Sequence, residues 1–142
     1  MIVTLTSLVG NWQREFAKFA PSLTVTVHHG DKRHERRAAI ANHDVIITTY
    51  PMVARDKDDL ATIPLHLVVL DEAHAIKNCN AQASEAVRRL DARHRVCLSG
   101  TPIENHLGEL WSLFDFLNPG LLGSIGDFNQ QFRQPIEEKS DR

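Results

Sequence analysis

Residues 66–74, HLVVLDEAH, hold the side chains best suited to chemistry in this chain, the adjacent carboxylates of Asp71 and Glu72. The apolar run 67–70 in front of them predicts a buried strand of a parallel sheet, with the acids at its carboxyl end. In that place an acid can hold the magnesium ion of a nucleotide while its neighbour orients the attacking water. The alternative is an ordinary helix start, where Asp and Glu are favoured for electrostatic reasons alone.

Strands and helices that could position these acids alternate along the chain. Apolar patterning predicts strands at 2–5, 23–27, 45–49, 67–70 and 96–98. Helices are expected between and after them, at 7–20, 31–42, 51–60, 81–90 and 106–117. The alternation predicts an α/β fold whose mostly parallel sheet is covered by helices on both faces.

The first expected helix has a cap and an apolar face. Ser7 is a candidate N-cap, and Trp12, Phe16 and Phe19 recur at spacings of four and three, which places them on one face. We expect these aromatic side chains to lie in the core.

Length and composition fit one compact domain. With 142 residues, of which 42% are hydrophobic, the chain can bury one core. The formal net charge of −2 gives no overall basic signature, so any nucleic-acid contact has to come from local patches. The two cysteines imply no disulfide framework, and no apolar run is long enough for a membrane span. We expect a cytoplasmic protein, or a nuclear one in a eukaryote.

Several longer motifs accompany DEAH. They are VCLSGTPIEN at 96–105, GELWSLFDFLNPGLLGS at 108–124, TSLVGNWQREFAKF at 6–19 and DVIITTYPMV at 44–53. Together they resemble the SWI/SNF branch of the superfamily two helicase-like ATPases, which are DNA-translocating motors. The resemblance covers nearly the whole chain. It implies a RecA-like three-layer sandwich that works with ATP and Mg²⁺, with residues 1–125 forming a partial first motor lobe and 126–142 a trailing segment.

The resemblance also implies roles for individual residues. Asp71 would bind the magnesium ion through water, and Glu72 would polarise the hydrolytic water. His74 would link the nucleotide to a coupling segment, which is Ser99, Gly100 and Thr101. The alternatives are a capping or surface role for the histidine, and plain turn chemistry before a proline for the two hydroxyls.

Contacts with double-stranded DNA are implied for loops at the strand ends. The corresponding residues are Thr6, Ser7, Asn11, Thr48 and Thr49. Small hydroxyls and helix N-termini suit phosphate oxygens and allow tracking without sequence reading. The basic residues between 32 and 37 could add a strip of charge, although such a helix is more often simply solvated. Leu5 stands where the family usually has proline, which affects the loop that carries Ser7.

A glycine-rich phosphate loop of the form GxxxxGK followed by Ser or Thr does not occur in these 142 residues. In the family, that loop precedes the TSL segment and a second RecA-like lobe follows the FLNPGLLGS segment. We therefore expect this chain to be the interior and end of a first lobe, inactive by itself and able to self-associate or to bind a second lobe. Two other hypotheses remain: a protein-interaction module derived from such a lobe, and an unrelated α/β nucleotide hydrolase.

Overall fold

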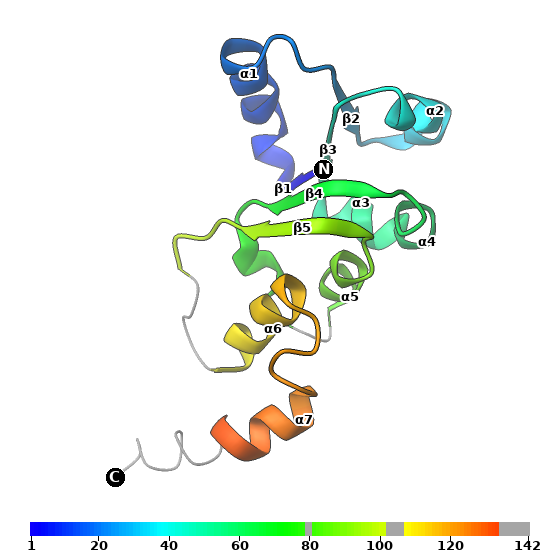
Figure 1. Ribbon diagram of the computed structural model, residues 1–142. Helices are drawn as coiled ribbons and strands as arrows, with labels where there is room; N and C mark the ends of the chain where they lie inside the picture. The colour runs from blue at the N-terminus through cyan, green and yellow to red at the C-terminus, as the bar shows by residue number, and fades with distance from the viewer. Residues whose placement is uncertain (79–80, 102–106, 134–142) are drawn as a thin grey trace.

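The computed structural model describes residues 1–78, 81–101 and 107–133. Five strands within these residues form one parallel sheet in the order β2-β3-β1-β4-β5 (Figure 1). The strands are β1 Ile2–Thr4, β2 Val25–His28, β3 Val45–Thr49, β4 Leu65–Leu70 and β5 Ala92–Cys97. The α/β class with a parallel sheet is therefore confirmed.

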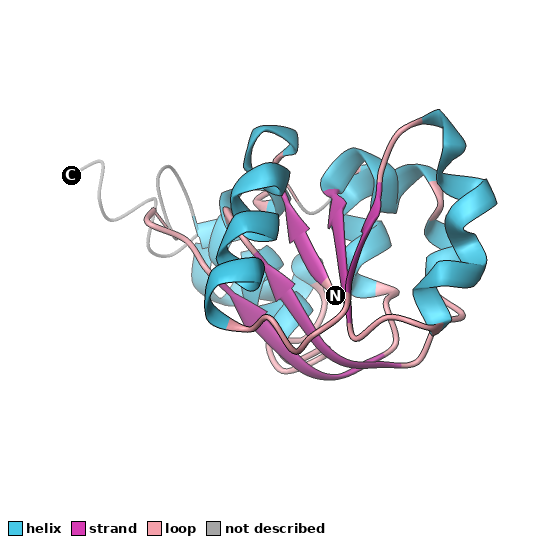
Figure 2. Cartoon of the chain, turned by 90° about the horizontal axis from the view of Figure 1, so that it is seen from above, coloured by secondary structure: helices cyan, strands magenta, loops and turns pink. Residues whose placement is uncertain are grey.

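Helices lie on both sides of the sheet (Figure 2). Helix α1, Val9–Phe19, lies over one face, while the other helices that pack on the sheet lie over the opposite face, with α6 against β5 (Figure 1). Those helices are α2 Arg37–Ala41, α3 Tyr50–Arg55, α4 Lys57–Leu60, α5 Gln82–Arg88 and α6 Leu107–Leu117. The chain continues into α7, Ile125–Phe128, and a π-helical turn, Asn129–Arg133. Among the described residues, no helix combines the length and the hydrophobicity that a membrane span requires.

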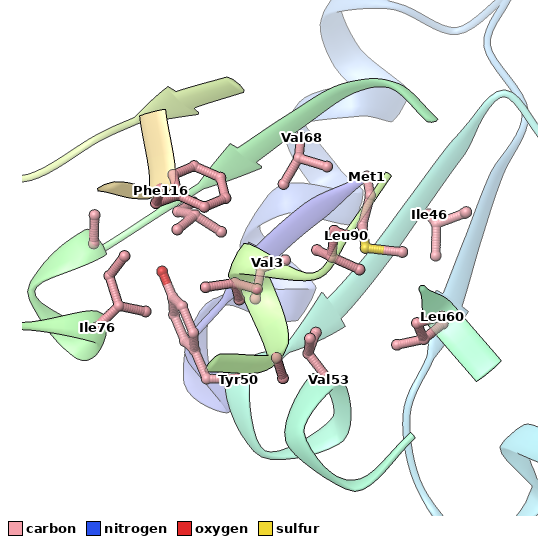
Figure 3. Close-up of a cluster of buried hydrophobic side chains, with 14 of the residues drawn as sticks. Met1, Val3, Ile46, Tyr50, Val53, Leu60, Val68, Ile76, Leu90 and Phe116 are labelled. Atoms are coloured by element: carbon pink, nitrogen blue, oxygen red, sulfur yellow. The ribbon is translucent and has the colours of Figure 1, made fainter. Parts of the chain in front are cut away.

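The hydrophobic core lies between the sheet and the helices opposite α1 (Figure 3). Val3 and Val68 from the strands meet Val53 and Phe116 from the helices, and all four have no exposed surface. Burial of each such side chain contributes about 1.5–3 kcal/mol, so this face holds the domain together.

Helix α1 differs from the prediction that its aromatic residues form core. None of its residues is buried: Phe19 is 71% exposed, and Trp12 and Phe16 are half-buried. Helical spacing puts the three side chains on one face, but the described residues fill only part of the space against that face. The predicted cap is also wrong, because residues Thr6–Leu8 form a 3-10 turn and no side chain caps the helix that follows.

Other elements differ at their ends. Strand β5 begins at Ala92, earlier than predicted, because it pairs with β4 from Leu65 onward despite its charged residues. The helix expected at 51–60 is divided into α3 and α4 at Asp56, whose backbone leaves the helical region. The segment expected as a helix at 31–42 begins with a 3-10 helix, Asp31–Arg36. The expectation of a frayed end concerns residues 137–142, which lie outside the described part of the chain.

Candidate functional site

The carboxyl ends of the central strands bring the predicted residues together. Strand β1 lies between β3 and β4, so Thr4 pairs with Thr49 on one side while Val3 pairs with Leu70 on the other. The ladder continues past β4, because the Asp71 amide donates to the Val3 carbonyl at 2.8 Å. Asp71 is therefore fixed at the edge where ligands bind in open parallel sheets.

The Asp71 carboxylate is held by three protein donors. Its Oδ2 accepts from the Thr4 hydroxyl at 2.9 Å and from the Trp12 indole at 2.8 Å, and its Oδ1 accepts from the Glu72 amide at 3.0 Å. An ionised carboxylate offers about four lone-pair positions, so one position, on Oδ1, remains for a further donor. The sequence did not reveal Thr4 or Trp12 as partners of this group.

Tyr50 secures the backbone at the same point. Its hydroxyl donates to the Asp71 carbonyl at 2.6 Å, and the side chain belongs to the buried core. Burial raises the pKa of the Tyr50 phenol, with smaller contributions from Cys97, Asp71 and Glu72. The phenol therefore stays protonated and remains a donor at neutral pH.

Glu72 occupies a strained backbone conformation. Its φ of 51° and ψ of 51° place it in the left-handed region, where no other non-glycine residue of the described chain is found. Such conformations cost energy and cluster at functional sites. The turn directs the chain from β4 into the 3-10 helix Ala73–Ile76, and the Glu72 side chain is 42% exposed. The Glu72 Oε2 lies 3.3 Å from the His74 Nδ1.

The coupling segment lies beside this turn. The Ala73 amide donates to the Leu98 carbonyl at 2.9 Å, and the Leu98 amide donates to the Leu70 carbonyl at 2.8 Å. These bonds fasten the start of the SGT segment to the end of β4. The Ser99 hydroxyl accepts from the Thr101 amide at 3.3 Å, and Gly100 is exposed. Among the described interactions, none joins His74 directly to this segment.

The candidate DNA contacts divide into two groups. Thr6, Ser7 and Asn11 are exposed at the 3-10 turn and in the first turn of α1. Thr48 and Thr49 have no exposed surface. The Thr48 hydroxyl donates to the His28 carbonyl at 2.9 Å, and the buried Thr49 hydroxyl has no hydrogen-bond partner.

One residue of the basic strip expected between positions 32 and 37, Arg33, lies in a buried cluster. Arg33 donates to Asp56 from Nε at 2.5 Å and from Nη2 at 2.9 Å, and His28 Nε2 lies 2.8 Å from the same carboxylate. The bonds from Arg33 and then from His28 lower the pKa of Asp56 to about 2. Lys32 and Arg37 remain exposed, and the side chain of Arg36 lies outside the described part.

The donor chemistry at the end of β4 fits a magnesium ion. Mg²⁺ prefers oxygen ligands and usually binds through one or two carboxylates together with water and substrate phosphates. Asp71 with its free lone pair and the exposed Glu72 supply such oxygens. No group of three or more His, Cys, Asp or Glu side chains able to hold a metal is found among the described residues.

Known proteins similar to this chain include a bacterial and two yeast proteins. YwqA of Bacillus subtilis is 43% identical over 144 residues, which cover 99% of this chain and 16% of that protein. The ISWI chromatin-remodeling complex ATPase ISW2 of Saccharomyces cerevisiae is 39% identical over 146 residues, 98% of this chain and 13% of that protein. The TATA-binding protein-associated factor mot1 of Schizosaccharomyces pombe is 43% identical over 143 residues, 99% of this chain and 7% of that protein.

The fold agrees with these relatives. The solved SWI2/SNF2 ATPase core of Sulfolobus solfataricus in complex with dsDNA superposes with a TM-score of 0.88 at 40% identity, covering 96% of this chain and 28% of that one. The RecA-like fold and the resemblance read from the motifs are thus confirmed, and the chain spans less than a third of the length of any of these proteins. The family model of the SNF2-related domain matches residues 1–142, and the chain therefore belongs to the SNF2-related family.

Proposed function

We propose that this chain works as the interior and end of the first RecA-like lobe of an ATP-dependent translocase that moves along double-stranded DNA. Residues 1–125 would form the lobe and residues 126–142 a trailing segment. The observation that carries the proposal is the end of β4, where Asp71 keeps one free lone pair beside the strained, exposed Glu72. Such a motor works where DNA is found, in the cytoplasm of a prokaryote or the nucleus of a eukaryote.

The two acids divide the work. Asp71, held by three donors, would bind the water shell of the magnesium ion through its free Oδ1 position. Glu72 would accept a hydrogen bond from the attacking water and orient it. ATP with Mg²⁺, when bound, supplies the phosphate to be transferred and neutralises its charge. The His74 side chain lies 3.3 Å from the Glu72 carboxylate. It would link the nucleotide at that carboxylate to the coupling segment, Ser99, Gly100 and Thr101.

The exposed hydroxyls and amide of Thr6, Ser7 and Asn11 would bind DNA phosphates directly. The similar archaeal core was solved with double-stranded DNA, which supports a DNA partner. Thr48 and Thr49 are buried, so we assign to them the shaping of the neighbouring strand end.

The isolated chain should hydrolyse ATP no faster than background. Its 142 residues hold no phosphate loop, and Glu72 cannot accelerate transfer of a phosphate that nothing holds in line. The test is phosphate release by the purified chain with and without duplex DNA. Robust DNA-stimulated phosphate release that Glu72→Gln abolishes would contradict the proposal that this chain is an inactive part of a two-lobed motor.

A second candidate function is that of a protein-interaction module. Exposed apolar side chains favour it, with Phe19 71% and Leu121 63% exposed. In the complete motor the same surfaces would face a second lobe or neighbouring parts of the protein.

A further inference from the structure

We propose that Thr4 and Trp12 are positioning residues through which DNA binding acts on the Asp71 carboxylate. The proposal rests on the function proposed above and adds to it the route by which DNA stimulates hydrolysis. Both residues donate to one oxygen, Asp71 Oδ2, at 2.9 Å and 2.8 Å.

The two donors bracket the segment that would touch DNA. Thr4 is the last residue of β1, and Trp12 lies in the first turn of α1. Between them lie residues 5–11, which include the exposed Thr6, Ser7 and Asn11. The segment contains the 3-10 turn and the start of α1, and the residues on its two sides are hydrogen-bonded to the same carboxylate.

The two anchors differ in how firmly they are held. Thr4 has no exposed surface and belongs to a strand paired on both sides, so it is fixed to the sheet. Helix α1 buries none of its residues, and the indole bond of Trp12 ties its first turn to the end of β4. A DNA phosphate that binds residues 5–11 and shifts them would therefore move Trp12 more than Thr4.

Movement of Trp12 changes the group that would meet the magnesium ion. Hydrogen bonds to an ionised acceptor are short and strongly directional, so a shift of the indole turns the carboxylate or weakens its bond. The effect reaches Glu72 as well, because its amide donates to Oδ1 of the same carboxylate at 3.0 Å. Coupling of this kind is reciprocal for binding, so metal and DNA would each alter the affinity for the other.

Amide and indole NMR signals of the 142-residue chain test the coupling directly. The chain has two tryptophans, so its indole region holds two signals, and Trp111→Phe assigns them. Titration with a short DNA duplex should shift the amides of residues 6–11, the Trp12 indole and the Glu72 amide. The Trp111 indole, which donates to the Gly123 carbonyl at 3.2 Å, should stay in place.

Two substitutions separate coupling from direct contact. Trp12→Phe and Thr4→Val each remove one donor without changing charge, and each should reduce the DNA-induced shift of the Glu72 amide at least about threefold. Trp111→Phe, the matched control, should leave that shift unchanged. If duplex DNA moves the amides of 6–11 but neither the Trp12 indole nor the Glu72 amide, the coupling is wrong while the proposed DNA contact stands. If no amide of 6–11 responds, the proposed contact fails and the coupling fails with it.

The complete motor gives a second measurement. Duplex DNA should change the Mg²⁺ concentration for half-maximal binding of a non-hydrolysable ATP analogue by about fivefold or more, within the usual range of coupling between sites. Trp111→Phe should behave as the unsubstituted protein, whereas Trp12→Phe should reduce the change to less than about twofold. A full effect of DNA in Trp12→Phe would overturn the proposal.

Discussion

The left-handed conformation of Glu72 makes a prediction about stability that is separate from catalysis. At φ 51° and ψ 51° a side chain with Cβ costs about 1–2 kcal/mol, whereas glycine adopts this region freely. Glycine also lowers the free energy of unfolding by about 0.4–1 kcal/mol, because the unfolded chain gains conformational freedom. The balance predicts that Glu72→Gly is more stable than Glu72→Ala by about 0.5–1 kcal/mol.

A helical glutamate supplies the matched control. Glu85 is exposed within α5, where the backbone is helical and alanine is the preferred residue. There the order should reverse, with Glu85→Gly less stable than Glu85→Ala by about 1 kcal/mol. Each pair of variants loses the same carboxylate, so the difference within a pair reports the backbone alone.

Denaturant unfolding of the four variants, with the free energy of unfolding extrapolated to water, measures both differences. Opposite signs at the two positions are the expected result. If alanine were equal to or better than glycine at both, the turn after β4 would not be strained, and the idea that the fold stores energy at Glu72 would be wrong.

Three further predictions follow from other parts of the chain. Because the pKa of Asp56 is lowered from 3.8 to about 2, its contribution to stability is full above pH about 5 and is lost as pH falls through 4 toward 2; Asp56→Asn should flatten the unfolding free energy across that window. Burial raises the pKa of Cys97 to about 11, so in a Cys79→Ser variant alkylation at pH 8 should be at least about tenfold slower than for a free cysteine. The exposed Phe19 and Leu121 should promote self-association, and a strictly monomeric chain in sedimentation up to about 100 μM would count against it.

The architecture and the position of the two candidate acids after a buried strand were predictable because they rest on strong local patterns. The apolar run at 67–70 indicated a buried parallel strand, and β4 lies between β1 and β5 with Asp71 directly after it. The motifs then identified the family, because their length and order leave little room for accidental matches.

Long-range pairings were not predictable from patterns. The bond from Trp12 to Asp71 joins residues 59 positions apart, and helical spacing marked Trp12 only as apolar. Arg33 looked like part of a solvated basic run, yet its guanidinium is buried against Asp56. The left-handed turn at Glu72 gave no signal either, because glutamate has no preference for that conformation.

The short reach of local patterns also explains the errors at helix and strand ends. Arg93 and Arg95 interrupt the apolar pattern of β5, so the prediction missed residues 92–95 of the strand. Arg95 is accommodated there because its guanidinium donates to the Leu90 carbonyl at 2.6 Å and to the Phe116 carbonyl at 3.0 Å. Only the folded arrangement provides these acceptors.

Displacement of a third strand from a DNA triplex by the complete motor tests the central claim most directly, because it reports movement along duplex DNA powered by ATP. We expect ATP-dependent displacement by the unsubstituted motor. Glu72→Gln should keep nucleotide binding nearly intact but displace the strand about 100-fold more slowly or worse, because the amide cannot accept the proton of the attacking water. Asp71→Asn should instead weaken the magnesium-dependent binding of nucleotide. Displacement by Glu72→Gln at the rate of the unsubstituted motor, or displacement without ATP, would contradict the account.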